Sequence, residues 1–143
     1  MAITQAIAST FKQELMQAVH DFDTSGSGGD TFKIALYTAN ADLNQSTTVY
    51  ASTNEVSGTG YTLGGKTLTG TTVNSSGTVA YIDFDNVIWD PASFTARCAL
   101  IYNFSKSNKS VAVLDFGSDK TTTTKFTITM PTNSATNALI RMD

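Results

Sequence analysis

The stretch Phe32-Lys33-Ile34-Ala35-Leu36-Tyr37 shows most clearly what kind of fold this chain encodes. Successive side chains of a β-strand point to opposite faces of a sheet, so Phe32, Ile34 and Leu36 share one face. Near the other end of the chain, Phe126, Ile128 and Met130 have the same spacing. Both patterns predict strands with one strongly apolar face.

Similar segments recur along the rest of the chain. We predict strands at residues 31–38, 61–69, 78–84, 94–104, 109–116, 125–130 and 138–142, and a weaker one at 47–51. Glycine, proline, asparagine and serine separate them, for example at Ser107-Asn108 and Asp90-Pro91. Many short strands with no helix between them predict an all-β fold: a single β-sandwich of jelly-roll type with about eight antiparallel strands.

The first 22 residues have a different pattern. Apolar residues recur at every fourth position, which predicts a helix over residues 3–19 with an oblique apolar stripe. The Gly/Ser-rich residues 23–30 predict a flexible linker, so we expect a helical arm (1–22), a linker (23–30) and a sandwich domain (31–143). The arm is the candidate assembly interface, through Ile3, Ile7, Phe11, Leu15, Val19 and Phe22.

Composition limits the possible partners. The 143 residues suit one domain, and only 15% of them are charged, against about 25% in ordinary soluble proteins. The net charge is −3, and lysine and arginine do not cluster, so we expect no nucleic-acid partner. No apolar run approaches the roughly 20 residues that span a bilayer, and the first residues lack a secretion signal, so we expect no membrane partner.

The segment after the predicted helix resembles a metal site only in part. Asp21, Asp23, Ser25 and Gly26 match the first, third, fifth and sixth positions of an EF-hand calcium loop. The twelfth position, which should be a bidentate glutamate, is Phe32, so we expect a solvated turn and no bound metal or cofactor. Whether Asp21 and Asp23 bind a cation stays open. We expect His20 to cap the C-terminal end of the helix, where positive charge is favourable.

Asp83 and Asp85 lie two positions apart and form the strongest catalytic candidate. Paired carboxylates hydrolyse glycosidic bonds, although the same spacing also occurs on any solvated strand edge. No nucleophile elbow accompanies the single histidine, so we expect no catalytic residues and no enzyme. Cys98 lies in an apolar strand and is expected to be a buried thiol.

Two further groups of residues allow alternative interpretations. Tyr37, Tyr50, Tyr61 and Tyr102 either bind sugars or partners from the surface, or pack at the edge of the core. Glu55 and Arg97 are rare charges in a charge-poor chain, and they pair with each other or with backbone groups.

Several segments together resemble a family of small virion structural proteins of tailed bacteriophages. The residues that carry this resemblance are Gly29-Asp30-Thr31-Phe32-Lys33-Ile34-Ala35-Leu36-Tyr37-Thr38, Asn54-Glu55-Val56-Ser57-Gly58-Thr59-Gly60-Tyr61, Ala96-Arg97-Cys98-Ala99-Leu100-Ile101-Tyr102-Asn103, Val113-Leu114-Asp115-Phe116-Gly117-Ser118 and Ala138-Leu139-Ile140-Arg141. The resemblance implies a virion location and no catalytic residues.

On that basis we expect a capsid decoration (cement) protein, assembled as a homotrimer, that contacts the major capsid protein or other virion proteins. A neck, tail or fibre component is the first alternative. A module that binds host-surface carbohydrate through exposed tyrosines is the second, and a glycan-degrading enzyme that uses Asp83 and Asp85 is the third.

Overall fold

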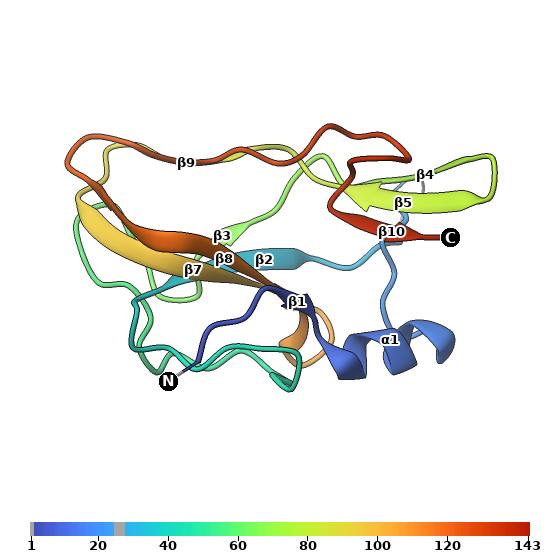
Figure 1. Cartoon of the computed structure of the whole chain (residues 1–143), viewed down its shortest axis with the longest axis horizontal. Helices are drawn as coiled ribbons and strands as arrows, with labels where there is room; N and C mark the ends of the chain where they lie inside the picture. The colour runs from blue at the N-terminus through green and yellow to red at the C-terminus, as the bar shows by residue number, and fades with distance from the viewer. Residues whose placement is uncertain (1, 25–27) are drawn as a thin grey trace.

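The computed structural model describes residues 2–24 and 28–143, and it confirms that the fold is mostly β. Within these residues, one short helix accompanies ten strands (Figure 1). In chain order the elements are β1 (Ala6–Ile7), α1 (Ser9–Met16), β2 (Phe32–Tyr37), β3 (Lys66–Thr67), β4 (Thr72–Ser76), β5 (Val79–Asp83), β6 (Val87–Trp89), β7 (Phe94–Asn103), β8 (Lys109–Thr122), β9 (Phe126–Ile128) and β10 (Ile140–Met142).

A five-stranded antiparallel sheet runs through the middle of the molecule, with the strand order β1-β8-β7-β2-β3. Its longest strands, β7 and β8, form a hairpin that turns at Ser107 and Asn108, as the sequence predicts. Both turn residues have positive φ, 55° and 60°, and the Lys109 N–H donates to the Lys106 carbonyl at 3.2 Å. This type I′ geometry matches the twist of the strands that it joins.

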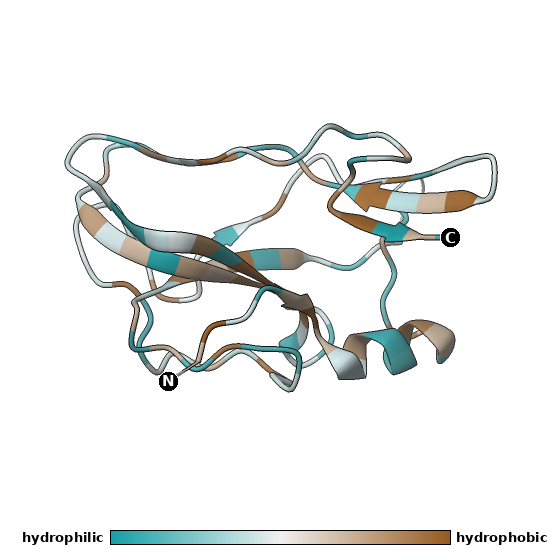
Figure 2. Ribbon diagram, in the orientation of Figure 1, coloured by the Kyte–Doolittle hydropathy of each residue, from teal (hydrophilic) through white to brown (hydrophobic). Residues whose placement is uncertain are grey.

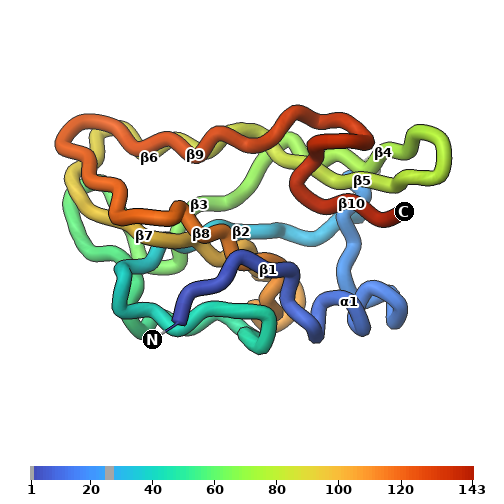
Figure 3. The backbone as a smooth tube through the Cα atoms, viewed as in Figure 1, coloured from blue at the N-terminus to red at the C-terminus, as the bar shows by residue number. Residues whose placement is uncertain are grey.

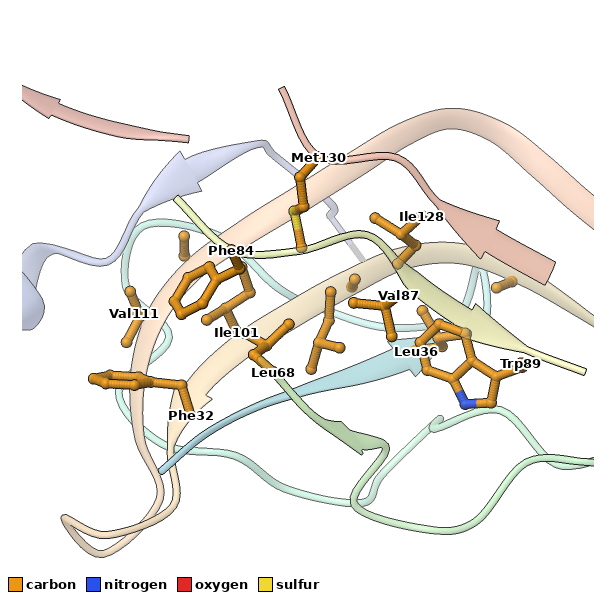
Figure 4. Packing of buried hydrophobic residues seen from close by; sticks show 14 of the residues in the cluster. Phe32, Leu36, Leu68, Phe84, Val87, Trp89, Ile101, Val111, Ile128 and Met130 are labelled. Carbon is orange, nitrogen blue, oxygen red and sulfur yellow. The ribbon is translucent and has the colours of Figure 1, made fainter. Parts of the chain in front are cut away.

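One face of this sheet is covered by two smaller sheets, β10-β5-β4 and β6-β9, which form a second layer. Figure 4 shows Phe32, Leu36 and Ile101 of the central sheet in one cluster with Val87, Trp89, Ile128 and Met130 of this layer. The predicted faces of the two strands at 32–36 and 126–130 therefore meet in one core, and the architecture is sandwich-like.

The opposite face of the central sheet is covered by irregular chain. Figure 3 shows the N-terminal segment and the loop after β2 on this side, away from the second layer. Ala35, Cys98, Leu100 and Val113 of the sheet pack there against Leu43 and neighbouring residues of the loop and N-terminal segment. The central sheet is thus buried on both faces, and this explains the nearly continuous apolar run of β7.

The prediction of a helix over residues 3–19 is wrong in its extent. The helix covers only Ser9–Met16, while Ala6 and Ile7 pair with Val113 and Ala112 of β8. Edge pairing of the sheet competes with helix formation, because it satisfies the backbone groups of residues that also fit a helical pattern. Figure 2 shows α1 with a hydrophilic middle between more apolar ends.

Side chains of residues 2–22 contribute to the common core, which contradicts the expected separate arm. Phe11 and Phe22 are 1% and 5% exposed and belong to the main apolar cluster, and Ala8 is fully buried. The Phe22 ring stacks on Phe32 of the central sheet with centroids 4.2 Å apart. The structure therefore shows no division of the molecule at residue 22. Of the linker at 23–30, residues 25–27 lie outside the described part of the chain.

Most of the strand predicted at residues 61–69 is absent, and only Lys66 and Thr67 pair. Gly64 and Gly65 have φ of 92° and 75°, and a side chain on Gly65 would clash with the Ile34 carbonyl. The chain approaches β2 too closely for a regular strand there. Besides β1, two strands escaped prediction, because β4 has no buried residue and β6 has only three residues.

Candidate functional site

Glu55 is the centre of the most fully satisfied polar cluster. Its carboxylate is 8% exposed and accepts hydrogen bonds from the Tyr50 hydroxyl at 2.7 Å, the Tyr61 hydroxyl at 2.6 Å and the Gly64 N–H at 2.8 Å. The expected backbone partner is present, whereas pairing with Arg97 is wrong: the Arg97 Nε lies 3.4 Å from Asp115 Oδ1. Three donors thus satisfy the Glu55 carboxylate inside the protein.

The four tyrosines of the alternative sugar site lie near this carboxylate, in the interior of the protein. Tyr37 and Tyr102 are each 1% exposed, and their hydroxyls donate to the Ala51 and Gly64 carbonyls at 2.8 and 2.7 Å. Burial raises the pKa of all four tyrosines, that of Tyr102 to about 12. The charge of Glu55 adds to this effect at Tyr37 and Tyr102, and the hydrogen bond to Glu55 adds to it at Tyr50 and Tyr61. Two of the four are fully buried, and the hydroxyls of all four bond inside the protein, so they are structural groups and not an exposed sugar platform.

His20 belongs to a second buried network, at the junction of α1 and the central sheet. Its Nε2 lies 2.7 Å from Glu14 Oε2, and its Nδ1 lies 3.0 Å from Asn103 Nδ2. Asn103 Nδ2 also donates to Asp30 Oδ2 at 2.7 Å. Because the Asn103 amide is a donor to both, this network assigns the ring proton to Nε2.

The expected capping role of His20 is therefore wrong. The helix ends at Met16, Ala18 turns the chain with a φ of 57°, and the His20 ring packs 4.8 Å from Phe11. This histidine links the N-terminal segment to the sheet.

The calcium-like loop is only partly described, since Ser25 and Gly26 lie outside the described residues. Asp21 Oδ1 accepts the Asp23 N–H at 2.9 Å, which is an ordinary turn contact. Within residues 2–24 and 28–143, no group of three or more His, Cys, Asp or Glu side chains has the arrangement of a metal site.

The structure separates the two aspartates of the catalytic alternative. Strand β5 ends at Asp83, which is 2% exposed, while Asp85 is exposed and lies beside Thr69. Burial raises the pKa of Asp83, and hydrogen bonds from the Phe84 and Leu139 backbones oppose that effect in part. One buried and one exposed carboxylate do not form the facing pair that glycoside hydrolysis requires.

Cys98 is fully buried in β7, as expected. Burial, followed by the charge of Asp115, raises the pKa of its thiol to about 12. The thiol is therefore neither exposed nor ionised under ordinary conditions.

The surface feature that sequence reasoning missed is an open side between the two layers. A hollow of about 620 Å³ lies between the outer half of β8 and strand β9, and its apolar lining includes Leu114, Phe116 and Ile128. A second hollow, of about 540 Å³, lies between α1 and β10. Ile7, Phe11 and Leu15 of the predicted interface line the second hollow, whereas Ile3 packs against the loop-covered face and Phe22 lies in the core. Val19 is half-buried.

Comparisons with known proteins found no matching family model, curated protein or solved structure. Among the described residues, no helix has both the length and the apolar character needed to cross a membrane.

Proposed function

We propose that this protein is a non-catalytic structural subunit of a tailed-bacteriophage virion, and most specifically a capsid decoration protein. One contrast supports the proposal most directly. The polar groups best suited to chemistry, at Glu55, His20 and Asp83, lie inside the molecule. Large apolar side chains, in contrast, are exposed on its surface. Met16 is 91% exposed and Met142 is 57% exposed, beside the hollow between α1 and β10. The family resemblance of the segments at 29–38, 54–61 and 96–103 agrees with this role.

In this role the protein acts through binding energy alone. A subunit that binds only the assembled shell stabilises that shell by mass action, by about 2.7 kcal/mol per site at a free concentration 100 times its Kd. Homotrimers at local threefold positions, in contact with the major capsid protein, would bind in this way. We propose in addition that the strands are connected in the order of a jelly roll.

Quantitative mass spectrometry of purified particles tests the proposal. A decoration protein is expected at hundreds of copies per particle, and a dozen or fewer copies would indicate a neck, tail or fibre component instead. Absence from washed particles would refute both roles.

Heat release of the packaged genome provides the functional measurement. Particles stripped of the protein should release their genome at a lower temperature, and added purified protein should restore the original value. Unchanged release temperatures would contradict the decoration role even if the protein is present in the particle.

A further inference from the structure

The two hollows follow one another along the open side of the sandwich, because neighbouring residues line them. Gln5 lines the first and Ile7 the second, while Leu139 and Ile140 line them on the opposite lip. One lip consists of α1, β1 and the outer half of β8, and the other of β9 and β10. We call this strip the seam. Phe116 and Phe126 form its floor, with ring centroids 6.1 Å apart.

Within residues 2–24 and 28–143, strand edges with no neighbouring strand border the seam on both lips. β10 is the last strand of its sheet, and β9 pairs only with β6. On the other lip, β1 pairs with β8 at Ala112 and Val113, and Val49 bridges to Lys109, so among the described residues β8 has no strand on that side from Leu114 onward. At Asp115 a side chain takes the place of a strand, because the N–H donates to Gln5 Oε1 at 3.2 Å. Open edges of this kind accept an added strand.

The charges of the seam differ from those of the whole protein. Lys120 and Lys125 line the first hollow, and Lys12 and Arg141 line the second. The only acidic residue of the lining is Asp115, which Arg97 already contacts. The seam is therefore cationic, in a protein whose net charge is −3.

These four cations also differ from the other five in having no ionic or aromatic partner among the described residues. Elsewhere, Lys106 and Lys109 pair with Asp30 and Glu14, as Arg97 does with Asp115. Lys33 and Lys66 lie over aromatic rings. In the seam, only Lys120 has a side-chain contact, with the Ser118 hydroxyl at 3.0 Å.

We propose that the seam binds an extended segment of a partner protein in which acidic and apolar residues alternate. The segment adds as a strand to an open edge, its apolar side chains enter the hollows, and its carboxylates face the four cations. Because the proposal rests on the proposed function, the partner is another protein of the virion.

The same charges argue against a second copy of this chain as the occupant. Two copies of β10 paired about a twofold axis would bring Arg141 against its own equivalent, since it is the central residue of that strand. Like charges opposite each other on paired strands are destabilising. A partner with carboxylates at those positions has the opposite effect.

The test uses the full-length protein and a blocked peptide of alternating glutamate and valine, about seven residues long, which is an ordinary strand length. A matched peptide carries lysine for glutamate. In two-dimensional amide NMR, the glutamate peptide should shift resonances of β8 from Leu114 onward, of β9 and of β10, and it should bind more weakly as salt is added. The lysine peptide should bind at least about tenfold more weakly.

Two variants of equal net charge locate the binding site. K120Q/K125Q removes two cations from the seam and should weaken binding by about fivefold. A39E/T53E adds two negative charges at exposed positions of the loop on the other face, and its affinity should stay within about twofold of the original.

Several results would overturn the proposal. These are no binding of the glutamate peptide, equal binding of both peptides, shifts confined to other surfaces, or equal weakening by the two variants. A dimer that forms with rising concentration and shifts the same resonances would identify a second copy as the occupant. Displacement of the peptide by an oligothymidylate would identify nucleic acid.

The two proposals can fail separately. If the peptide does not bind but the protein coats purified particles, only the seam proposal fails. If the peptide binds in the seam but the protein is absent from particles, the seam stands and the virion role fails.

Discussion

The two faces of the central sheet are buried in different ways. One face meets a second layer of strands through apolar side chains such as Trp89, Ile128 and Met130. The other meets an irregular loop, which Tyr37 and Tyr50 fix through hydrogen bonds to the Ala51 carbonyl and to Glu55. Loops lack the regular hydrogen bonds of a ladder, so side chains must supply partners for their backbone groups.

This difference implies different sensitivities. The strand-covered face should respond to lost volume, because closely packed apolar groups leave a cavity when they are truncated. The loop-covered face should respond to lost hydrogen bonds and to alkaline pH, because its anchors are tyrosine hydroxyls and a carboxylate.

Deletion of residues 2–22 should have the largest effect, since it damages both faces. It removes β1, the buried rings of Phe11 and Phe22, and the cover that Ile3 gives to the second face. We expect a chain with the circular dichroism and amide NMR spectrum of an unfolded protein. M16K, at a side chain 91% exposed on the same segment, is the control and should fold normally. A folded truncation would restore the separable-arm hypothesis.

Trp89→Ala tests the strand-covered face. Trp89 is 1% exposed and lies 6.0 Å from Phe126 and 6.5 Å from Phe94, centroid to centroid. We expect a loss of about 3–5 kcal/mol in the free energy of unfolding, measured by urea denaturation. The adjacent Ile88 is 45% exposed, and I88A should cost less than about 1 kcal/mol. Similar costs for the two variants would show that this face is not closely packed.

Glu55→Ala tests the loop-covered face. The change leaves the Tyr50 and Tyr61 hydroxyls and the Gly64 N–H without their acceptor, and we expect a loss of about 3 kcal/mol. E55Q keeps one acceptor oxygen and should lose less, about 1 kcal/mol. The same urea experiment gives both values, and equal losses would mean that the remaining amide oxygen does not replace the carboxylate as an acceptor.

Alkaline titration should separate the two faces without mutation. Folding raises the pKa of Tyr37, Tyr50, Tyr61 and Tyr102, whereas an unfolded tyrosine ionises near pH 10. Above that pH the folded state binds more protons than the unfolded state, so stability should fall as pH rises. Tyrosinate absorbance should therefore increase together with unfolding. Ionisation of these tyrosines in a protein that stays folded would contradict the buried arrangement.

Asp83→Asn should give the smallest effect, and its sign should depend on pH. Folding raises the pKa of Asp83, so its contribution to stability falls as pH rises from about 4 through the folded pKa. The amide of the variant cannot ionise, so D83N should gain stability relative to the original protein between about pH 4.5 and about pH 7.5. Urea denaturation at the two pH values measures this difference, and an unchanged difference would refute it.

The sequence predicted the regular parts of this molecule well. The spacing of Phe32, Ile34 and Leu36 identified β2 and its core-facing side, and Ser107-Asn108 identified the longest hairpin. These features depend on side-chain alternation and turn chemistry, which are local properties of the chain.

What the sequence could not give depends on contacts between distant segments. Ile7 fits a helical spacing but pairs with Ala112 of β8, and Glu55 meets Tyr61 and Gly64 only because the loop folds back on the sheet. The seam could not be predicted from the sequence either. Lys12 and Arg141 lie near opposite ends of the chain, and only the fold brings them to one hollow.

Because Cys98 is buried, the reaction of its thiol can report local opening of the protein. This thiol belongs to the cluster on the loop-covered face, opposite Tyr37 in the neighbouring strand. A thiol reagent can reach it only after the loop lifts or β7 separates from its neighbouring strands. The labelling rate therefore measures how often such local opening occurs. Since the chain has no other cysteine, labelling of Cys98 needs no engineered site. It can be measured inside a larger assembly as well as in solution.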